Sequence, residues 1–91
     1  MLFSEFKAPK GVIKVQLKIE DSEICSIKLT GDFFMYPEEA LSKFEDFLQG
    51  TEVEEGELRS TVKEFYNSSD IKTPMIGPEH WVKAILGAVG D

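Results

Sequence analysis

The chain has 91 residues, and its 17 acidic against 10 basic side chains give a formal charge of −7 with the one histidine neutral. A chain of this length builds one modest core, which excludes an enzyme with separate cofactor and substrate domains. The acidity argues against nucleic acid or a membrane surface as partner, because both require a basic face. An apolar content of 42% indicates one folded domain over residues 1–91 rather than a disordered acidic tail.

The start of the chain and its cysteine content indicate a reducing compartment. Residues 1–7 lack the basic start and long apolar run of a signal peptide, and no stretch approaches the roughly 18 apolar residues of a spanning helix. Cys25 is the only cysteine, so it forms no internal disulfide and cannot complete a cysteine-based metal site. We therefore expect a cytoplasmic protein.

Alternating segments in the first third of the chain predict an antiparallel sheet. Apolar and polar side chains alternate over residues 11–20, as in a half-buried strand. After a polar turn at residues 21–22, the odd-numbered residues from Cys25 to Leu29 form a second apolar face, which completes a hairpin. Residues 2–7 could add a third strand, so we expect a sheet of two or three strands.

The rest of the chain has helical periodicity. The first predicted helix begins at Pro37 and stops at Gly50, the second opens with a capping pair of Thr51 and Glu54, and the third begins at Pro78. Their apolar stripes are Leu41, Phe44, Phe47 and Leu48, then Leu58, Val62, Phe65 and Tyr66, then Trp81, Val82, Ile85, Leu86 and Val89. Helices packed on one face of an antiparallel sheet define an α+β fold.

No group of residues predicts a catalytic or metal-binding site. His80 lies in the first turn of a helix without a serine or cysteine at a recognisable spacing, which favours a solvated histidine. Cys25 falls on the apolar face of its strand, where a thiol behaves as a small buried hydrophobic group. The glutamates between residues 52 and 57 are typical of a solvated charge run. We therefore assign no catalytic residue and no metal ligand to the chain.

Residues 31–37 combine three aromatic residues and a methionine between the hairpin and the first predicted helix. One interpretation is structural: Phe33 and Phe34 plug the core, Gly31 permits an unusual backbone conformation, and Asp32 binds free amides of the turn. The other is functional, with the turn holding an exposed aromatic patch against another protein. The candidate partner-binding residues are Gly31, Asp32, Phe33, Phe34 and Tyr36.

These segments together resemble a known family. The hairpin, the run Gly31-Asp32-Phe33-Phe34 directly after it, and the helix ending Phe47-Leu48-Gln49-Gly50 resemble the C-terminal accessory domain of lipoate-protein ligases. The resemblance extends from about residue 6 to residue 89, and the Gly31 to Phe34 run is its most specific part. In that family the domain is fused behind a catalytic domain or, in some archaea, made as a separate short subunit. This chain resembles the separate form.

The resemblance implies an accessory role. The catalytic subunit of such a heterodimer would hold lipoate, ATP and magnesium, and this chain would bind none of them alone. The accessory part would be needed to make lipoyl-adenylate and less needed to transfer the lipoyl group. Lipoyl acceptor domains of 2-oxoacid dehydrogenases or the H protein of glycine cleavage would be indirect partners. The alternative is a small acidic interaction module unrelated to lipoate.

The expected fold also resembles the scaffold proteins of iron–sulfur assembly. Those scaffolds carry cysteines in the loop before the long strand, after the hairpin and near a later helix. Here the first two positions are Ala8-Pro9 and Gly31-Asp32, and no cysteine follows Cys25. The residues therefore argue against an iron–sulfur scaffold even though the backbone is similar.

Overall fold

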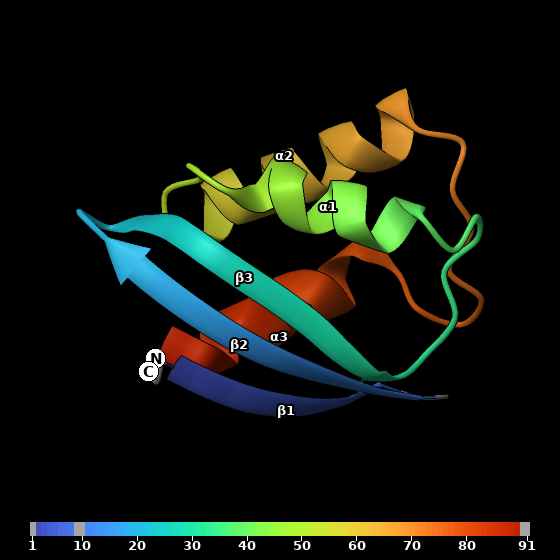
Figure 1. Ribbon diagram of the computed structural model, residues 1–91, viewed down its shortest axis with the longest axis horizontal. Helices are drawn as coiled ribbons and strands as arrows, with labels where there is room; N and C mark the ends of the chain where they lie inside the picture. The colour runs from blue at the N-terminus through green and yellow to red at the C-terminus, as the bar shows by residue number, and fades with distance from the viewer. Residues whose placement is uncertain (1, 9–10, 90–91) are drawn as a thin grey trace.

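In the computed structural model, which describes residues 2–8 and 11–89, the chain folds into three strands and three helices (Figure 1). The sheet is an antiparallel meander in the order β1-β2-β3, so the α+β fold and the third strand are confirmed. In chain order the elements are β1 (Leu2–Ala8), β2 (Gly11–Glu20), β3 (Glu23–Asp32), α1 (Ala40–Leu48), α2 (Glu55–Ser68) and α3 (Pro78–Val89).

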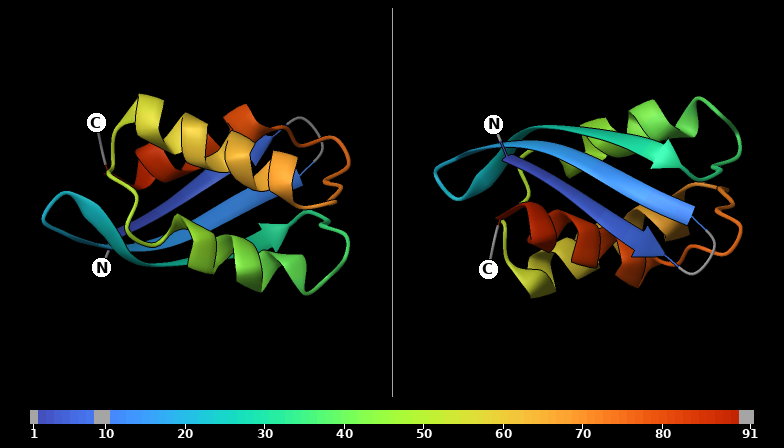
Figure 2. Two further views of the ribbon diagram at one scale, coloured as in Figure 1. Left: turned by 90° about the horizontal axis from the view of Figure 1, so that it is seen from above. Right: turned by 90° about the horizontal axis from the view of Figure 1, so that it is seen from below.

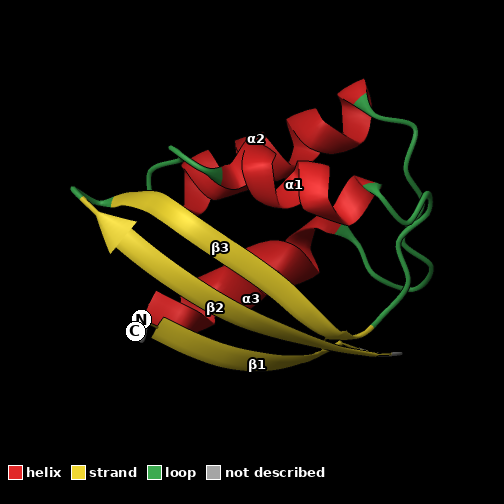
Figure 3. Cartoon of the chain, in the orientation of Figure 1, coloured by secondary structure: helices red, strands yellow, loops and turns green. Residues whose placement is uncertain are grey.

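The helices cover one face of the sheet in two tiers. α1 packs against β3, and α3 packs against β1 and β2. α2 packs on α1 and α3 rather than on the sheet, and the view from above in Figure 2 shows it over part of α3. Figure 3 shows the result, with helices on one side and strands on the other. The core therefore lies between the sheet and α1 and α3, with α2 closing it from outside.

Aromatic rings link the layers of the core. Trp81 of α3 is fully buried, and its ring meets Phe44 of α1 edge-on at a centroid distance of 5.3 Å. Phe44 in turn stacks on Phe65 of α2 at 4.9 Å. Each such pair stabilises a fold by about 0.5–1.5 kcal/mol beyond burial of its area. The three helices thus meet at one aromatic cluster above the sheet.

The β2–β3 hairpin departs from strict alternation at Cys25. Lys18 pairs with Ser26, but the next residue, Ile19, pairs with Ile24, so Cys25 is an extra residue on β3. A bulge of this kind shifts the alternation by one position. Ile24 is consequently buried and Cys25 is exposed. The prediction of a buried Cys25 is wrong, because it assumed an uninterrupted period of two.

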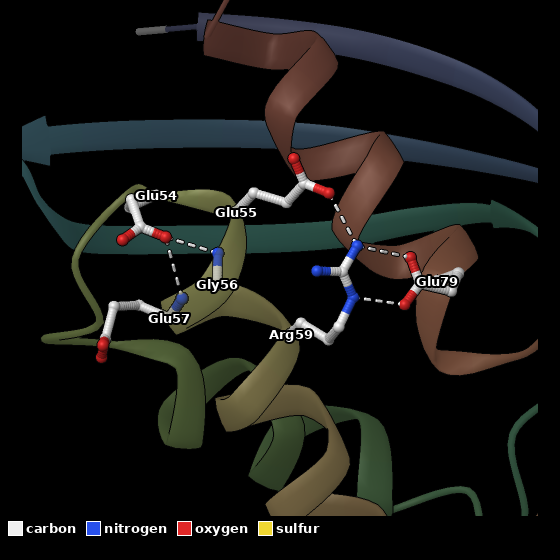
Figure 4. A network of polar contacts seen from close by, with 6 residues as sticks. All are labelled: Glu54, Glu55, Gly56, Glu57, Arg59 and Glu79. Atoms are coloured by element: carbon white, nitrogen blue, oxygen red, sulfur yellow. Dashed lines mark hydrogen bonds and ion pairs between the residues drawn. The ribbon is translucent and has the colours of Figure 1, made fainter.

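Two helices begin later than the sequence predicts. α1 begins at Ala40, because residues 37–39 form a turn in which the Ala40 N–H donates to the Pro37 carbonyl at 3.0 Å. α2 is capped by Glu54, whose carboxylate accepts from two amides of the first turn (Figure 4). The Thr51 and Glu54 capping pair is therefore wrong. The start of α3 at Pro78 and the end of α1 before Gly50 are confirmed.

Two side chains of the predicted apolar stripes reach the surface. Phe47 is 38% exposed and Val89 is 41% exposed. Phe47 still contacts the core, since its ring centroid lies 5.4 Å from that of Phe65. Both residues lie in the last two positions of their helices.

The outer edge of β3 is covered by the loop that follows α1 and by one side chain of α1. The N–H of Ile24 donates to the Thr51 carbonyl at 2.9 Å, and the N–H of Gly50 donates to the Ile24 carbonyl at 2.8 Å. Further along the strand, the N–H of Leu29 donates to the Glu45 carboxylate at 2.7 Å. An uncovered edge strand is a template for pairing with other chains. The loop that follows α1 therefore protects this edge from pairing with another chain.

One cluster of charged side chains joins α2 to α3 (Figure 4). The Arg59 guanidinium contacts Glu79 through two hydrogen bonds, Nε to Oε2 at 2.5 Å and Nη2 to Oε1 at 3.0 Å, and Glu55 at 2.7 Å. The hydrogen bond from Arg59 lowers the pKa of Glu79, and the two carboxylates raise the pKa of Arg59. These side chains are partly exposed, so solvent screening limits their contribution to stability.

We predict that Ser22→Gly stabilises the protein by about 0.5 kcal/mol, because glycine adopts a left-handed conformation without steric cost. Asp21 and Ser22 form the β2–β3 turn with φ of +51° and +66°. Urea unfolding measures the change. Ser60→Gly, at an exposed position inside α2, is the matched control and destabilises the protein. A Ser22→Gly variant less stable than the wild type would contradict the turn geometry.

We also predict a pH-dependent contribution from Glu79. Its pKa is lowered on folding, so the ion pair stabilises the protein above the unfolded-state pKa and this contribution is lost as the pH falls through the folded-state pKa. Wild type should therefore exceed Glu79→Gln in unfolding free energy at pH 7, and the difference should disappear at acidic pH. Glu64→Gln, which removes no ion pair among the described residues, is the control. A difference independent of pH would contradict the ion pair.

Candidate functional site

Two aromatic rings stand exposed directly after β3. Phe34 is 60% exposed and Tyr36 is 48% exposed, and their rings are parallel within 3° at a centroid distance of 6.1 Å. We call these two side chains the aromatic shelf. Exposed aromatic side chains contribute little to a fold, whereas buried in an interface they are among the strongest contributors to binding.

The shelf arises because the extended chain continues to alternate past the end of the sheet. Phe33 points inward and meets the ring of Trp81 edge-on at 5.1 Å, and Met35 is 5% exposed. Phe34, which lies between these two residues, and Tyr36, which follows Met35, point outward instead. Of the two interpretations, the structural one, in which both side chains plug the core, therefore holds for Phe33 and not for Phe34. Partner binding by these residues stays a prediction.

Gly31 and Asp32 play different parts at the base of this segment. Gly31 has φ of +128°, and a Cβ atom there would lie 2.2 Å from the carbonyl oxygen of Val12. Only glycine fits this close approach, so the predicted conformational role of Gly31 is confirmed. Asp32 is exposed, and within residues 2–8 and 11–89 its carboxylate makes no hydrogen bond, which contradicts its predicted contact with turn amides.

A second loop holds the shelf in place. Tyr36 forms an isolated β-bridge with Lys72, in which each N–H donates to the other's carbonyl at 2.9 Å. The bridge fixes the backbone of residues 34–36 against the loop between α2 and α3. Figure 1 shows these two loops side by side at the same end of the molecule.

A chain of side-chain hydrogen bonds anchors that second loop to the core. The Trp81 Nε1–H donates to the Tyr66 hydroxyl at 2.7 Å, the Tyr66 hydroxyl contacts Thr73 Oγ1 at 2.7 Å, and Thr73 Oγ1–H donates to the Ile76 carbonyl at 2.6 Å. The indole can only donate and the carbonyl can only accept. Tyr66 must therefore donate to Thr73, and every link is satisfied. Burial raises the pKa of Tyr66, which keeps its proton in place.

Beside the shelf lies an open hollow of about 290 Å³. Its walls are mainly aromatic and aliphatic, with a single carboxylate at the rim. An open apolar hollow of this kind suits a side chain of another protein better than an enclosed small molecule. The lining residues are Phe33, Phe34, Met35, Tyr36, Glu38 and Leu41.

His80 is not a free, fully solvated side chain. Its Nδ1 accepts a hydrogen bond from the Gly77 N–H at 2.9 Å, and its ring lies 5.9 Å from that of Phe6. The prediction of a solvated histidine is therefore only partly right, because the imidazole is half-buried and satisfies an amide at the start of α3.

The described part of the chain offers no grouping for metal chemistry. No three histidine, cysteine, aspartate or glutamate side chains within it are placed to hold a metal ion. Among the described helices none has both the length and the apolar character needed to cross a membrane. Among the described residues, the hydrogen-bond partner of the His80 ring is the Gly77 amide rather than a serine or cysteine side chain.

One exposed side chain of this region escaped the sequence analysis. Met75, in the loop joined to the shelf, is 62% exposed and has φ of +66°. The available signal was the Thr73-Pro74-Met75-Ile76 sequence, because proline commonly precedes a residue of positive φ in a tight turn. The adjacency of this turn to the shelf depends on the bridge at Lys72, which no local pattern indicates.

Comparisons with known proteins assign this chain to a family. A family model described as "Bacterial lipoate protein ligase C-terminus" matches residues 3–84. The Lipoate-protein ligase A subunit 2 of Thermoplasma acidophilum is 37% identical over 86 residues, which cover 93% of this chain and 88% of that protein.

A solved structure agrees with the sequence comparisons. It comes from a study of a bipartite lipoate protein ligase and its E2 lipoyl domain from Thermoplasma acidophilum. The matched chain is 34% identical, with a TM-score of 0.84 and coverage of 93% of this chain and 94% of that one. The chain belongs to the family of the lipoate-protein ligase C-terminal domain, as its hairpin and Gly31 to Phe34 run indicated.

Proposed function

We propose that this protein is the non-catalytic accessory subunit of an ATP-dependent lipoate-protein ligase and acts as a heterodimer with a separate catalytic subunit. The observation that carries the proposal is the match along nearly the whole chain to a relative named as the second subunit of such a ligase. The surface agrees with this role, since it offers an exposed aromatic shelf.

The finer part of the proposal concerns the reaction step. The accessory subunit is required with the catalytic subunit to activate lipoate to lipoyl-adenylate. ATP, magnesium and lipoate are held by the complex, and this chain alone binds none of them. Docking of a small rigid domain beside an adenylation site excludes water and orders its loops, which favours attack of the lipoate carboxylate on the α-phosphate over hydrolysis.

The aromatic shelf is the proposed contact with the catalytic subunit. Phe34 and Tyr36 are large, rigid and exposed, and the bridge to Lys72 holds their backbone in one conformation. A surface ordered in advance loses little entropy on binding. Lipoyl acceptor domains of 2-oxoacid dehydrogenases, or the H protein of glycine cleavage, would then meet the complex rather than this chain alone.

The direct test is lipoate-dependent exchange of pyrophosphate into ATP by the catalytic subunit of the same organism, with and without this protein. We expect exchange only in the mixture. Full exchange by the catalytic subunit alone would overturn the role in adenylate formation. Absence of any complex between the two chains would instead favour an acidic interaction module unrelated to lipoate.

We predict that Phe34→Ala weakens the complex by about 10- to 100-fold, as expected for an aromatic residue central to an interface. Tyr36→Ala should act in the same direction. Calorimetric titration with the catalytic subunit measures the dissociation constant, and urea unfolding measures stability, which should change little because both rings are exposed.

The matched control is Phe3→Ala. Phe3 is 63% exposed, as large as Phe34, and lies on β1 opposite Gln16, far along the sheet from the shelf. Its loss should leave the dissociation constant unchanged. Equal affinity of wild type and Phe34→Ala would remove the shelf from the interface.

A further inference from the structure

Met75 occupies a position that its own turn disfavours. The N–H of Ile76 donates to the Thr73 carbonyl at 3.0 Å, so Pro74 and Met75 are the central residues of a tight turn. The second central residue has φ of +66°, a conformation that favours glycine or asparagine in such turns. An L side chain pays about 1–2 kcal/mol to adopt it.

Packing within the chain does not account for the methionine. Its side chain is 62% exposed, so the core gains little from it. The polar chain through Tyr66 and Thr73 anchors the turn through other side chains. The fold would therefore be at least as stable with glycine at this position, and packing within the fold gives no reason for the thioether side chain.

The location of the turn suggests that the Met75 side chain has a role in binding. The bridge between Tyr36 and Lys72 joins the loop of Met75 to the segment that carries the aromatic shelf, and both loops lie at one end of the molecule (Figure 1). Three large apolar side chains, Phe34, Tyr36 and Met75, are thus exposed on two adjacent loops. Methionine is flexible and polarisable and fits irregular apolar surfaces.

We propose that Met75 is a binding residue for the catalytic subunit, so that the docking surface runs from the aromatic shelf onto the loop between α2 and α3. The inference rests on the proposed function, which supplies the occupant: a subunit that must meet this chain and that buries an apolar patch against it. Continuity with the shelf favours one surface over two separate ones.

The test uses a substitution with opposite effects on folding and on binding. Met75→Gly removes both the side chain and the steric cost of positive φ. We expect unfolding by urea to occur at an equal or higher midpoint, and the dissociation constant for the catalytic subunit to rise by about 5- to 30-fold. Met75→Leu, which keeps an apolar side chain of similar size, should retain most of the affinity.

Ser22→Gly is the matched control. It relieves the same kind of backbone conformation, but at the tip of the β2–β3 hairpin. It should raise stability without changing the dissociation constant. A Met75→Gly variant that binds as tightly as wild type would overturn the inference while leaving the proposed function intact. Failure of the wild-type chain to bind the catalytic subunit would overturn the proposed function, and the inference with it.

Discussion

Burial of the Trp81 indole is the constraint on which the rest of the structure depends. The ring is fully buried among Phe33, Phe44 of α1 and Tyr66 of α2, and its N–H is thereby removed from water. A buried donor without a partner costs about 1–3 kcal/mol. Tyr66 supplies the partner, and its own hydroxyl then requires an acceptor, which Thr73 provides. The position of a loop is thus determined by the hydrogen-bonding requirement of one core residue.

The hydrogen bonds that begin at the Trp81 indole also determine where the backbone of the aromatic shelf lies. Thr73 is fixed by its two neighbours in this polar chain, and Lys72 beside it pairs with Tyr36. On the other side of the indole, Phe33 packs edge-on against the ring and fixes where the shelf begins. The core and the candidate site are therefore connected. A substitution in the core near Trp81 would displace the aromatic shelf even though no residue of the shelf is changed.

The parts of the fold that follow from local patterns could be predicted, and those that depend on distant partners could not. Alternation in β2 and the apolar stripe of α2 arise from the period of each element, whatever surrounds it. The exposure of Cys25 depends on a bulge in its pairing with β2, and α1 begins at Ala40 because residues 37–39 form a turn before it. At the candidate site, the sequence predicts the need for glycine at position 31. It does not predict that Phe33 points inward and Phe34 outward, because this depends on where Trp81 lies in the folded chain.

Positive φ at a non-glycine residue does not by itself mark a functional position, and the two ends of this molecule show why. Ser22 adopts it in the hairpin turn, where its side chain is small and polar and the backbone carbonyl accepts a hydrogen bond from the Val53 N–H. Met75 adopts it with a large apolar side chain held out in solvent. The steric cost of positive φ at Ser22 is offset because this residue closes the β2–β3 hairpin. The exposed side chain of Met75 makes no comparable contribution to the stability of the fold. Met75 lies on the loop that is bridged to the segment of the aromatic shelf, and this location, rather than the positive φ alone, supports the proposed contact.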